Sequence, residues 1–154
     1  MTSQQDLASI ARAVIDANSY MTLATADGAG LPWPSPVWYA HLGYREFYWV
    51  SSPAARHSRN LAERPQAGVV IFDSHVAAGN AQAVYMTATA AEVTPDELAE
   101  GIEVFSARSQ ALLGRPWTRE EVCAPASLRL YRAGVSKLFV IDGVDQRMRT
   151  EIGE

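Results

Sequence analysis

The chain has 154 residues, of which 48% are hydrophobic and 19% are charged, a composition that excludes a disordered protein. At this length we expect one domain, residues 1–154, whose core is large enough to fold without disulfides or metal. Thirteen basic residues against seventeen acidic ones leave a net charge of −4, which argues against a broad nucleic-acid-binding surface.

Cysteine and histidine usage argues against disulfide and metal chemistry. Cys123 has no partner for an internal disulfide, and a lone thiol is typical of a reducing compartment. His41, His57 and His75 lie far apart, and no C-x-x-C or H-E-x-x-H motif is present, so we expect no metal site. The sequence contains neither a run of roughly 20 apolar residues nor an apolar signal core, so we expect a cytoplasmic protein.

The first part of the chain predicts a helix followed by strands. Ser3 and Asp6 resemble a capping box, and apolar residues then recur at helical spacing up to a stop near Asn18. The turn Asp27-Gly28-Ala29-Gly30 and a second turn at Gly43 separate segments rich in β-forming residues. These predicted strands cover 19–25, 32–39 and 47–50.

The strand at 32–39 has prolines at alternate positions, Pro32, Pro34 and Pro36. Proline lacks the backbone N–H, and at alternate positions every missing donor lies along the same edge of the strand. A central strand could not tolerate this loss, because one whole ladder would have no donors. We therefore expect that edge to face solvent, a bulge or a ligand.

Two further helices and a short helical turn are predicted. Ser51-Ser52-Pro53 opens a helix with proline in its first turn, and the helix ends before Pro65. Thr94-Pro95-Asp96-Glu97 is a capping box that predicts a second helix starting there and ending at Gly114. Thr118 begins the short helical turn.

The remaining segments predict strands, and a polar tail follows from Asp142. These strands cover 69–72, 83–93, 128–131 and 135–141. Strands that follow one another through tight turns, with helices between groups, do not match the regular alternation of a doubly wound parallel sheet. The predicted fold class is α+β, mainly antiparallel β, with the helices around a barrel.

A group of polar and basic residues near the start of the helix after Ser51 predicts an anion site. Unpaired N–H groups and the helix dipole attract an anion there, whereas Arg56, His57 and Arg59 would oppose the dipole. A phosphate held by hydroxyl, backbone and guanidinium donors would remove this cost. The alternative is a set of solvated side chains, because the penalty is only about 0.3–1 kcal/mol per charge.

Aromatic residues are dense on two successive strands. They could wall a planar ring system, but we favour a barrel core with a subunit interface, because aromatic side chains bury large areas. The residues are Trp33, Trp38, Tyr39, Tyr44, Phe47, Tyr48 and Trp49. His41 and His75 stand beside turns and are expected at the surface, and Cys123 is expected to be a buried thiol.

Several motifs occur in a fixed order from about residue 18 to residue 93. An Asp-Gly hairpin leads to Pro-x-x-x-Pro-Val-Trp-Tyr and an aromatic strand, then to Ser-x-x-x-x-Arg-His-x-x-Asn-Leu and Pro-x-x-Gly-Val-Val. This order resembles the pyridoxamine-phosphate-oxidase-like family of flavin-binding split β-barrels. The resemblance implies a split β-barrel of six or so strands and a homodimer with FMN in a cleft between the subunits.

The resemblance also implies a set of cofactor-binding positions. The strand from Ser35 to Tyr39 would lie along the flavin, partly through backbone groups, and Arg56 and His57 would grip the phosphate. The implied positions are Ser35, Pro36, Val37, Trp38, Tyr39, Val50, Ser51, Arg56 and His57. The strand edge without donors and the anion site near Ser51, inferred from the residues themselves, coincide with these positions.

Departures from the authentic vitamin B6 oxidases argue against pyridoxamine phosphate as the substrate. His57 replaces the usual lysine, Ser35 replaces an arginine, and Ala40 replaces a lysine. We therefore expect an FMN-dependent oxidoreductase that passes hydride to or from another small molecule, with no side chain assigned as acid or base.

Three alternatives stay open at this point. A relative that uses the deazaflavin F420 could meet its longer anionic tail with Arg59. A non-enzymatic protein could store or sense flavin or haem, with His57 or His75 as the axial ligand of a haem. The third alternative is a dimeric domain whose cleft has lost its ligand, and the helices at 95–124 could form a lid over the cleft or a dimer contact.

Overall fold

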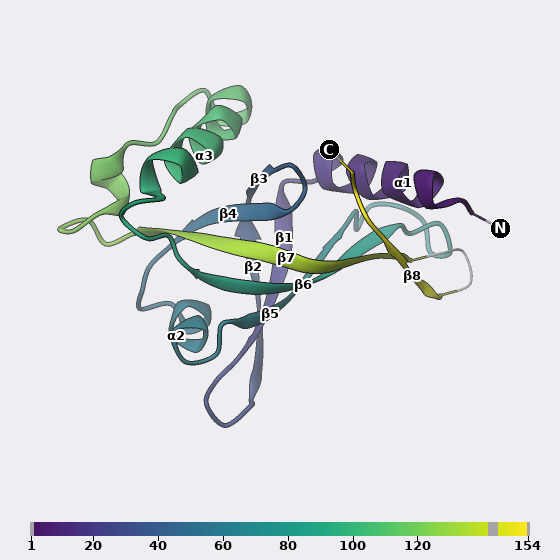
Figure 1. Cartoon of the computed structure of the whole chain (residues 1–154), viewed down its shortest axis with the longest axis horizontal. Helices are drawn as coiled ribbons and strands as arrows, with labels where there is room; N and C mark the ends of the chain where they lie inside the picture. The colour runs from purple at the N-terminus through teal and green to yellow at the C-terminus, as the bar shows by residue number, and fades with distance from the viewer. Residues whose placement is uncertain (1, 142–144, 154) are drawn as a thin grey trace.

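The computed structural model describes residues 2–141 and 145–153. Its strands form one antiparallel sheet in the order β2-β1-β5-β6-β7-β4-β3, and β8 pairs with β7 (Figure 1). The strands are β1 (Tyr20–Ala26), β2 (Pro32–Trp38), β3 (Ala40–Leu42), β4 (Glu46–Ser51), β5 (Gln66–Phe72), β6 (Ala83–Glu92), β7 (Arg129–Ile141) and β8 (Arg147–Thr150). The helices are α1 (Gln4–Ala17), α2 (Arg56–Glu63), α3 (Leu98–Leu113) and the 3-10 helix η1 (Arg119–Val122).

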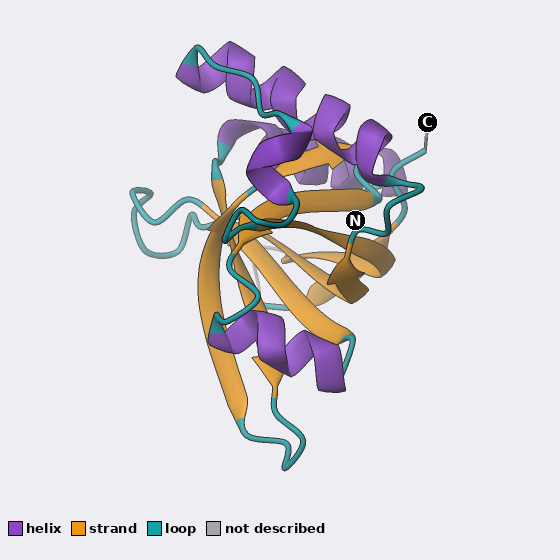
Figure 2. Ribbon diagram, turned by 90° about the vertical axis from the view of Figure 1, so that its left-hand side faces the viewer, coloured by secondary structure: helices purple, strands orange, loops and turns teal. Residues whose placement is uncertain are grey.

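The sheet curls into a split barrel with helices at its periphery, which confirms the predicted α+β class. Figures 1 and 2 show α2 beside the β1–β2 hairpin at one end of the barrel, with α1 and α3 toward the other end. The sheet has eight strands where about six were expected, because the short strands β3 and β8 add to the predicted set. No helix in the described ranges is long and apolar enough to span a bilayer.

β2 is an end strand of the sheet, as its prolines predicted. Among the described residues it pairs only with β1, and Pro32, Pro34 and Pro36 lie opposite alternate residues of that strand. Proline cannot donate to a ladder, so its nitrogen must point away from β1. The free edge of β2 is therefore lined by carbonyl groups without N–H donors at the three proline positions.

The main core lies inside the barrel and under α1. The capping box at the start of α1 is present, with the Ser3 hydroxyl accepting from Asp6 N–H and the Asp6 carboxylate accepting from Ser3 N–H. The helix buries one apolar stripe against inward-facing strand residues. Members of this core include Leu7, Ile15, Leu23, Tyr39, Phe47, Trp49, Ile71 and Val140.

A smaller second core joins α3 and η1 to the β3–β4–β7 side of the sheet. Tyr48 and Leu130 contribute from the sheet, and Leu98 and Phe105 from α3. Gly101 allows this approach, since a Cβ atom there would lie 2.8 Å from Leu130 Cδ2 and 3.1 Å from Tyr48 Cε1. Four of the seven predicted aromatic residues, Tyr39, Phe47, Tyr48 and Trp49, are fully buried, as expected for core.

Both later helices begin some residues after their predicted starts. Ser51 instead pairs with β7 as the last residue of β4, and the turn after it places α2 no earlier than Arg56. The Thr94 hydroxyl donates to the Glu97 carboxylate (3.0 Å), which closes an isolated turn before α3. The predicted ends at Pro65 and Gly114 are confirmed, and Gly114 takes the left-handed conformation with φ of 72°.

The C-terminal strands also differ from the prediction. The two expected segments form one continuous strand, β7, because β6 and β4 pair with it across Gly134. An irregularity in the β6 register leaves Ser136 as the extra residue of a β-bulge. The predicted polar tail contains β8, which is held by its ladder to β7, while the first tail residues, from Asp142 to position 144, lie outside the described residues.

Candidate cofactor-binding site

Helix α2 is fastened to the β1–β2 hairpin by polar contacts, of which the bond between Asn60 and Thr25 is buried. Asn60 Nδ2 donates to the Thr25 hydroxyl (3.0 Å), which donates to the Trp33 carbonyl (3.2 Å). Arg64 donates to the Gly28 carbonyl in the hairpin turn (2.9 Å). These contacts set the position of the start of α2 relative to β2.

The Arg56 guanidinium lies over the Trp33 ring, with Cζ 4.2 Å from the ring centroid. Trp33 is 41% exposed, so the pair lies at the surface beside β2. Within the described ranges Arg56 has no ion pair and its side chain makes no hydrogen bond. A cation–π contact orients the guanidinium without using its N–H donors, which remain free for an anion.

Ser51 and His57, two further candidate residues, contact each other. His57 Nε2 is 2.8 Å from Ser51 Oγ, and burial lowers the pKa of His57 below its ordinary value of 6.5. The imidazole is therefore neutral at pH 7 and acts as a hydrogen-bonding group. Ser52 does not cap the helix, because its hydroxyl accepts from Ala54 N–H within the preceding turn (3.1 Å).

The predicted strand residues divide by the two faces of β2. Ser35, Val37 and Tyr39 are buried, whereas Pro36 is exposed. Trp38 packs edge-on against Phe105 of α3, with ring centroids 5.2 Å apart. The side chains of Ser35, Val37 and Tyr39 are therefore structural, and contact between this strand and a ligand would use the backbone edge.

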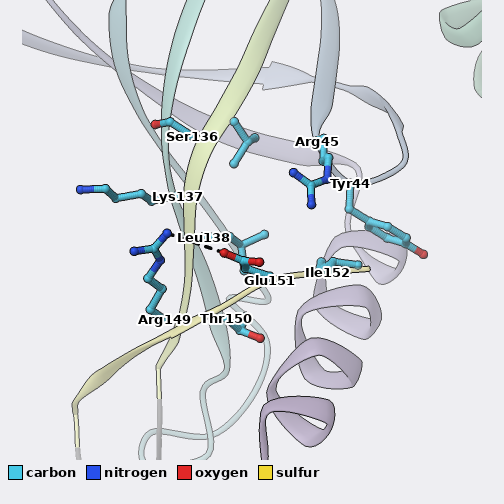
Figure 3. Close-up of a pocket in the computed structure, with 10 residues that line it drawn as sticks. Tyr44, Arg45, Ser136, Lys137, Leu138, Arg149, Thr150, Glu151 and Ile152 are labelled. Atoms are coloured by element: carbon cyan, nitrogen blue, oxygen red, sulfur yellow. Dashed lines mark ion pairs between the residues drawn. The ribbon is translucent and has the colours of Figure 1, made fainter. Parts of the chain in front are cut away.

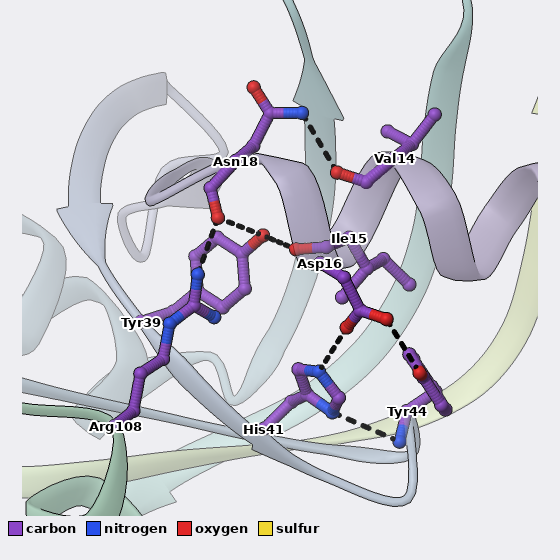
Figure 4. A network of polar contacts seen from close by, with 8 residues as sticks. All are labelled: Val14, Ile15, Asp16, Asn18, Tyr39, His41, Tyr44 and Arg108. Carbon is purple, nitrogen blue, oxygen red and sulfur yellow. Dashed lines mark hydrogen bonds and ion pairs between the residues drawn. The ribbon is translucent and has the colours of Figure 1, made fainter. Parts of the chain in front are cut away.

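The Tyr39 side chain belongs to a polar network at the end of α1. Its hydroxyl donates to the backbone carbonyls of Ile15 (2.5 Å) and Asn18 (3.0 Å), and burial raises the pKa of Tyr39 to about 12 (Figure 4). Arg108 of α3 also donates to the Asn18 carbonyl, and its guanidinium lies over the Tyr39 ring with Cζ 4.5 Å from the centroid. Tyr39 thus joins α1, β2 and α3 and has no free polar group for a cofactor.

His41 is not the surface residue that its place beside a turn predicted. Its side chain is 16% exposed, and Nε2 lies 3.0 Å from Asp16 Oδ1 (Figure 4). Nδ1 accepts a long hydrogen bond from Tyr44 N–H (3.4 Å), so both ring nitrogens have protein partners. His75 is 94% exposed, as predicted. Cys123 is half-buried where full burial was expected, because η1 covers it only in part.

The structure therefore brings Ser51 and His57 into hydrogen-bond contact and places Arg56, the preceding residue of α2, over Trp33. Val50 is half-buried against the second core. Sequence reasoning missed Trp33 and Asn60 as site residues. The signal for Asn60 was its spacing of four residues from Arg56, one helical turn, which places both on one side of α2. In the described residues no group of three or more acidic, histidine or cysteine side chains could hold a metal ion.

The sequence profile described as pyridoxamine 5'-phosphate oxidase matches residues 9–128, more than half of the chain. The chain belongs to the pyridoxamine 5'-phosphate oxidase family. The matched residues include the strand motifs whose order resembled this oxidase family. No curated protein matches the sequence.

Solved structures similar to this oxidase-family chain include proteins with different described roles. A haem-binding protein from Mycobacterium smegmatis is 23% identical with a TM-score of 0.73, covering 97% of this chain and 58% of that one. The haem storage protein HutZ from Vibrio cholerae is 22% identical with a TM-score of 0.66, covering 88% and 95%. General Stress Protein 26 from Bacillus anthracis is 11% identical with a TM-score of 0.63, covering 92% and 97%. At these identities the likeness establishes the fold, and the chain spans little more than half of the M. smegmatis protein.

Proposed function

We propose that this chain binds FMN between two copies of itself and passes hydride between the flavin and a small molecule. The observation that carries the proposal is the Arg56 guanidinium, which lies over Trp33 with no counter-ion in the described part of the chain and is on the same helix turn as His57. A guanidinium with free donors is suited to a phosphate, which accepts two parallel hydrogen bonds from it.

The chain's own residues would hold and orient the cofactor, while FMN would supply the redox chemistry. Arg56 would bind the phosphate, with Ser51 and His57 as further hydrogen-bonding partners. The free edge of β2 offers carbonyl acceptors at the proline positions, which suit the imide N–H of a flavin ring. Trp33 would shield the phosphate contact from water on one side.

The outer face of the sheet suits an interface with a second copy of the chain. Strands β2, β1, β5 and β6 present outward positions that carry no charged residue. Exposed or half-buried members of this face are Pro32, Pro34, Pro36, Tyr20, Ala24, Val70, Phe72 and Thr87. We call these residues the uncharged face. An extended surface of this kind is typical of a protein interface.

The test is FMN binding measured with an Arg56→Ala variant. We expect the protein with added FMN to show a two-banded flavin spectrum, and Arg56→Ala to weaken FMN by about 10- to 100-fold, since one charge-assisted hydrogen bond contributes about 1.5–3 kcal/mol. Arg59→Ala is the matched control, because Arg59 is exposed and donates to the Ala54 carbonyl of its own loop. Unchanged FMN affinity in Arg56→Ala would show that Arg56 does not bind the FMN phosphate.

A second candidate function is haem binding, and the state of His57 favours it. A neutral imidazole is the form that ligates iron, and burial lowers the pKa of His57 and so favours that form. Binding would require the Ser51 contact on Nε2 to open. A Soret band that is lost in His57→Ala but retained in Arg56→Ala would favour haem over FMN.

The same spectra test the deazaflavin alternative. A single deazaflavin band in the protein with added F420 would indicate that cofactor.

A further inference from the structure

A second cavity lies where β7 changes its neighbour along one edge. β4 pairs with β7 as far as Gly134, and β8 pairs with it from Leu138 onward. Val135 N–H donates to the Arg45 carbonyl (2.8 Å), and across the described residues no strand pairs with 136–137 on that edge. A cavity of about 100 Å³ opens at this gap (Figure 3). It shares no residue with the proposed FMN site.

The charged lining of this cavity is mainly cationic. Arg45, Lys137 and Arg149 line it from three different elements, and one carboxylate, Glu151, lies beside them (Figure 3). Arg149 NH2 is 3.7 Å from Glu151 Oε1, whereas Arg45 and Lys137 have no ion pair among the described residues. Three cations against one anion leave a positive site that a bound anion would compensate.

The turn that carries Arg45 is held in place from outside the cavity. Gly43 and Tyr44 both have φ of 58°, and Arg45 N–H donates to the Leu42 carbonyl (3.1 Å). The left-handed conformation is unfavourable for tyrosine. It is stabilised by the hydrogen bond from the Tyr44 hydroxyl to Asp16 (2.8 Å) and by ring stacking on His41, seen in Figure 4. The backbone position of Arg45 is therefore set before a ligand arrives.

We propose that this cavity binds a tetrahedral oxyanion, either free phosphate or the phosphate group of a small monoester. Its volume suits one such group, and three cationic side chains supply more donors than a single carboxylate needs. Leu138 and Ile152 are buried beside the cationic groups and lower the local polarity, which strengthens the attraction. Glu151 is the resident counter-ion of Arg149, and the incoming anion takes its place.

The test is a phosphate titration of the full-length protein followed by amide chemical shifts. Ionic strength is held constant with sodium chloride. The titration is made with the Arg56→Ala variant, so that phosphate binding at the proposed FMN site does not contribute to the shifts. We expect saturable shifts at amides 135–138 and 149–152. Arg149→Gln should weaken phosphate about tenfold, as expected for one charge-assisted contact, and Glu151→Gln should tighten it.

Arg147→Gln is the matched control for the cavity. Arg147 lies on the same strand and carries the same charge, but its guanidinium lies over Tyr85, with Cζ 4.9 Å from the ring centroid. Equal losses in Arg147→Gln and Arg149→Gln, or shifts that rise linearly without saturation, would overturn the proposal. Glycerol phosphate that binds more tightly than inorganic phosphate would identify the monoester as the ligand, and the reverse order would identify free phosphate. Either result is independent of whether FMN binds at Arg56.

Discussion

At the scale of single residues, His57 gives the proposed phosphate site a pH dependence that lysine would not. Burial holds the pKa of His57 below 6.5, so the imidazole gains its positive charge only as the pH falls through that lower value. A phosphate favours the charged form, and its binding would raise the pKa again. The affinity contributed by His57 should therefore increase toward acid pH.

The prediction is that FMN affinity of the wild-type protein rises relative to His57→Gln as the pH is lowered from 8 to 5.5. The gain should reach about tenfold, which corresponds to one charge-assisted hydrogen bond. FMN itself loses phosphate charge near pH 6, so the ratio of the two proteins, measured by flavin fluorescence, is the informative quantity. A ratio that does not change with pH would remove His57 from the phosphate site.

The lowered pKa of His57 also affects the stability of the protein without ligand, which should decrease toward acid pH while the FMN affinity increases. A histidine whose folded pKa lies below its unfolded value of 6.5 destabilises the fold in acid, because the unfolded chain binds the proton more tightly. The stability linked to His57 is present above pH 6.5 and is lost as the pH falls toward the folded pKa. His41 behaves in the same way, since burial outweighs the contact with Asp16 and lowers its pKa.

The sequence predicted the site residues that lie close together along the chain. Ser51 and His57 are close along the chain, so a strand-to-helix turn was enough to bring His57 Nε2 within 2.8 Å of Ser51 Oγ. Trp33 could not be assigned, because it comes from β2 and meets Arg56 only through the packing of α2 on the hairpin. The partners of the Tyr39 side chain could not be predicted for a related reason. Its hydroxyl is taken up by carbonyls of α1 that the local pattern does not reveal.

At the scale of secondary-structure elements, α3 is docked by close packing and by an ion pair at its start. Gly101 lies against Leu130 and Tyr48, both buried, and Glu97 accepts from Arg132 of β7 (3.0 Å). Arg108 secures the middle of the helix to the Asn18 carbonyl. These contacts hold helix α3 against the rest of the structure. They do not indicate a lid that opens and closes.

Gly101→Ala should lower the free energy of unfolding by up to about 2 kcal/mol. Alanine is the better helix former by about 1 kcal/mol, but overpacking a buried contact costs about 1–3 kcal/mol. The new Cβ would lie 2.8 Å from Leu130 Cδ2, and the buried neighbours have little space to move. Urea denaturation measures the change, with the exposed Glu103→Ala on the same helix as control. A more stable Gly101→Ala protein would show that the docking is loose.

At the scale of the whole molecule, the uncharged face makes the proposed dimer testable. Phe72 is 46% exposed at the end of β5 within this face. Phe72→Asp would bury an unpaired charge in the interface and should raise the dimer dissociation constant by about 100-fold or more, because such a charge costs several kcal/mol. Sedimentation analysis gives the readout, and FMN affinity should fall with the dimer.

Leu112→Asp is the control for the dimer experiment. Leu112 is 55% exposed on α3, outside the uncharged face, so an aspartate there should leave the sedimentation of the wild-type protein unchanged. Dimerisation that survives Phe72→Asp but not Leu112→Asp would move the interface to α3. A wild-type protein that sediments as a monomer with FMN bound would contradict the placement of the cofactor between two copies.

The sequence by itself determined the features that depend on neighbours a few residues away. The capping box of α1, the glycine at the end of α3 and the free edge of β2 follow from local hydrogen bonds and from prolines at alternate positions. Their physical cause lies within one turn or one strand, so the pattern of residues contains it.

Only the tertiary structure decided the features that depend on distant partners. Ser51 became strand instead of helix because β7 offered it a partner at Arg129, and β7 continued through Gly134 because two strands flank it there. The cationic cavity likewise joins Arg45 to Arg149, which are far apart in the sequence. Pairing between distant segments is selected by the free energy of the whole fold, and a local pattern does not contain it.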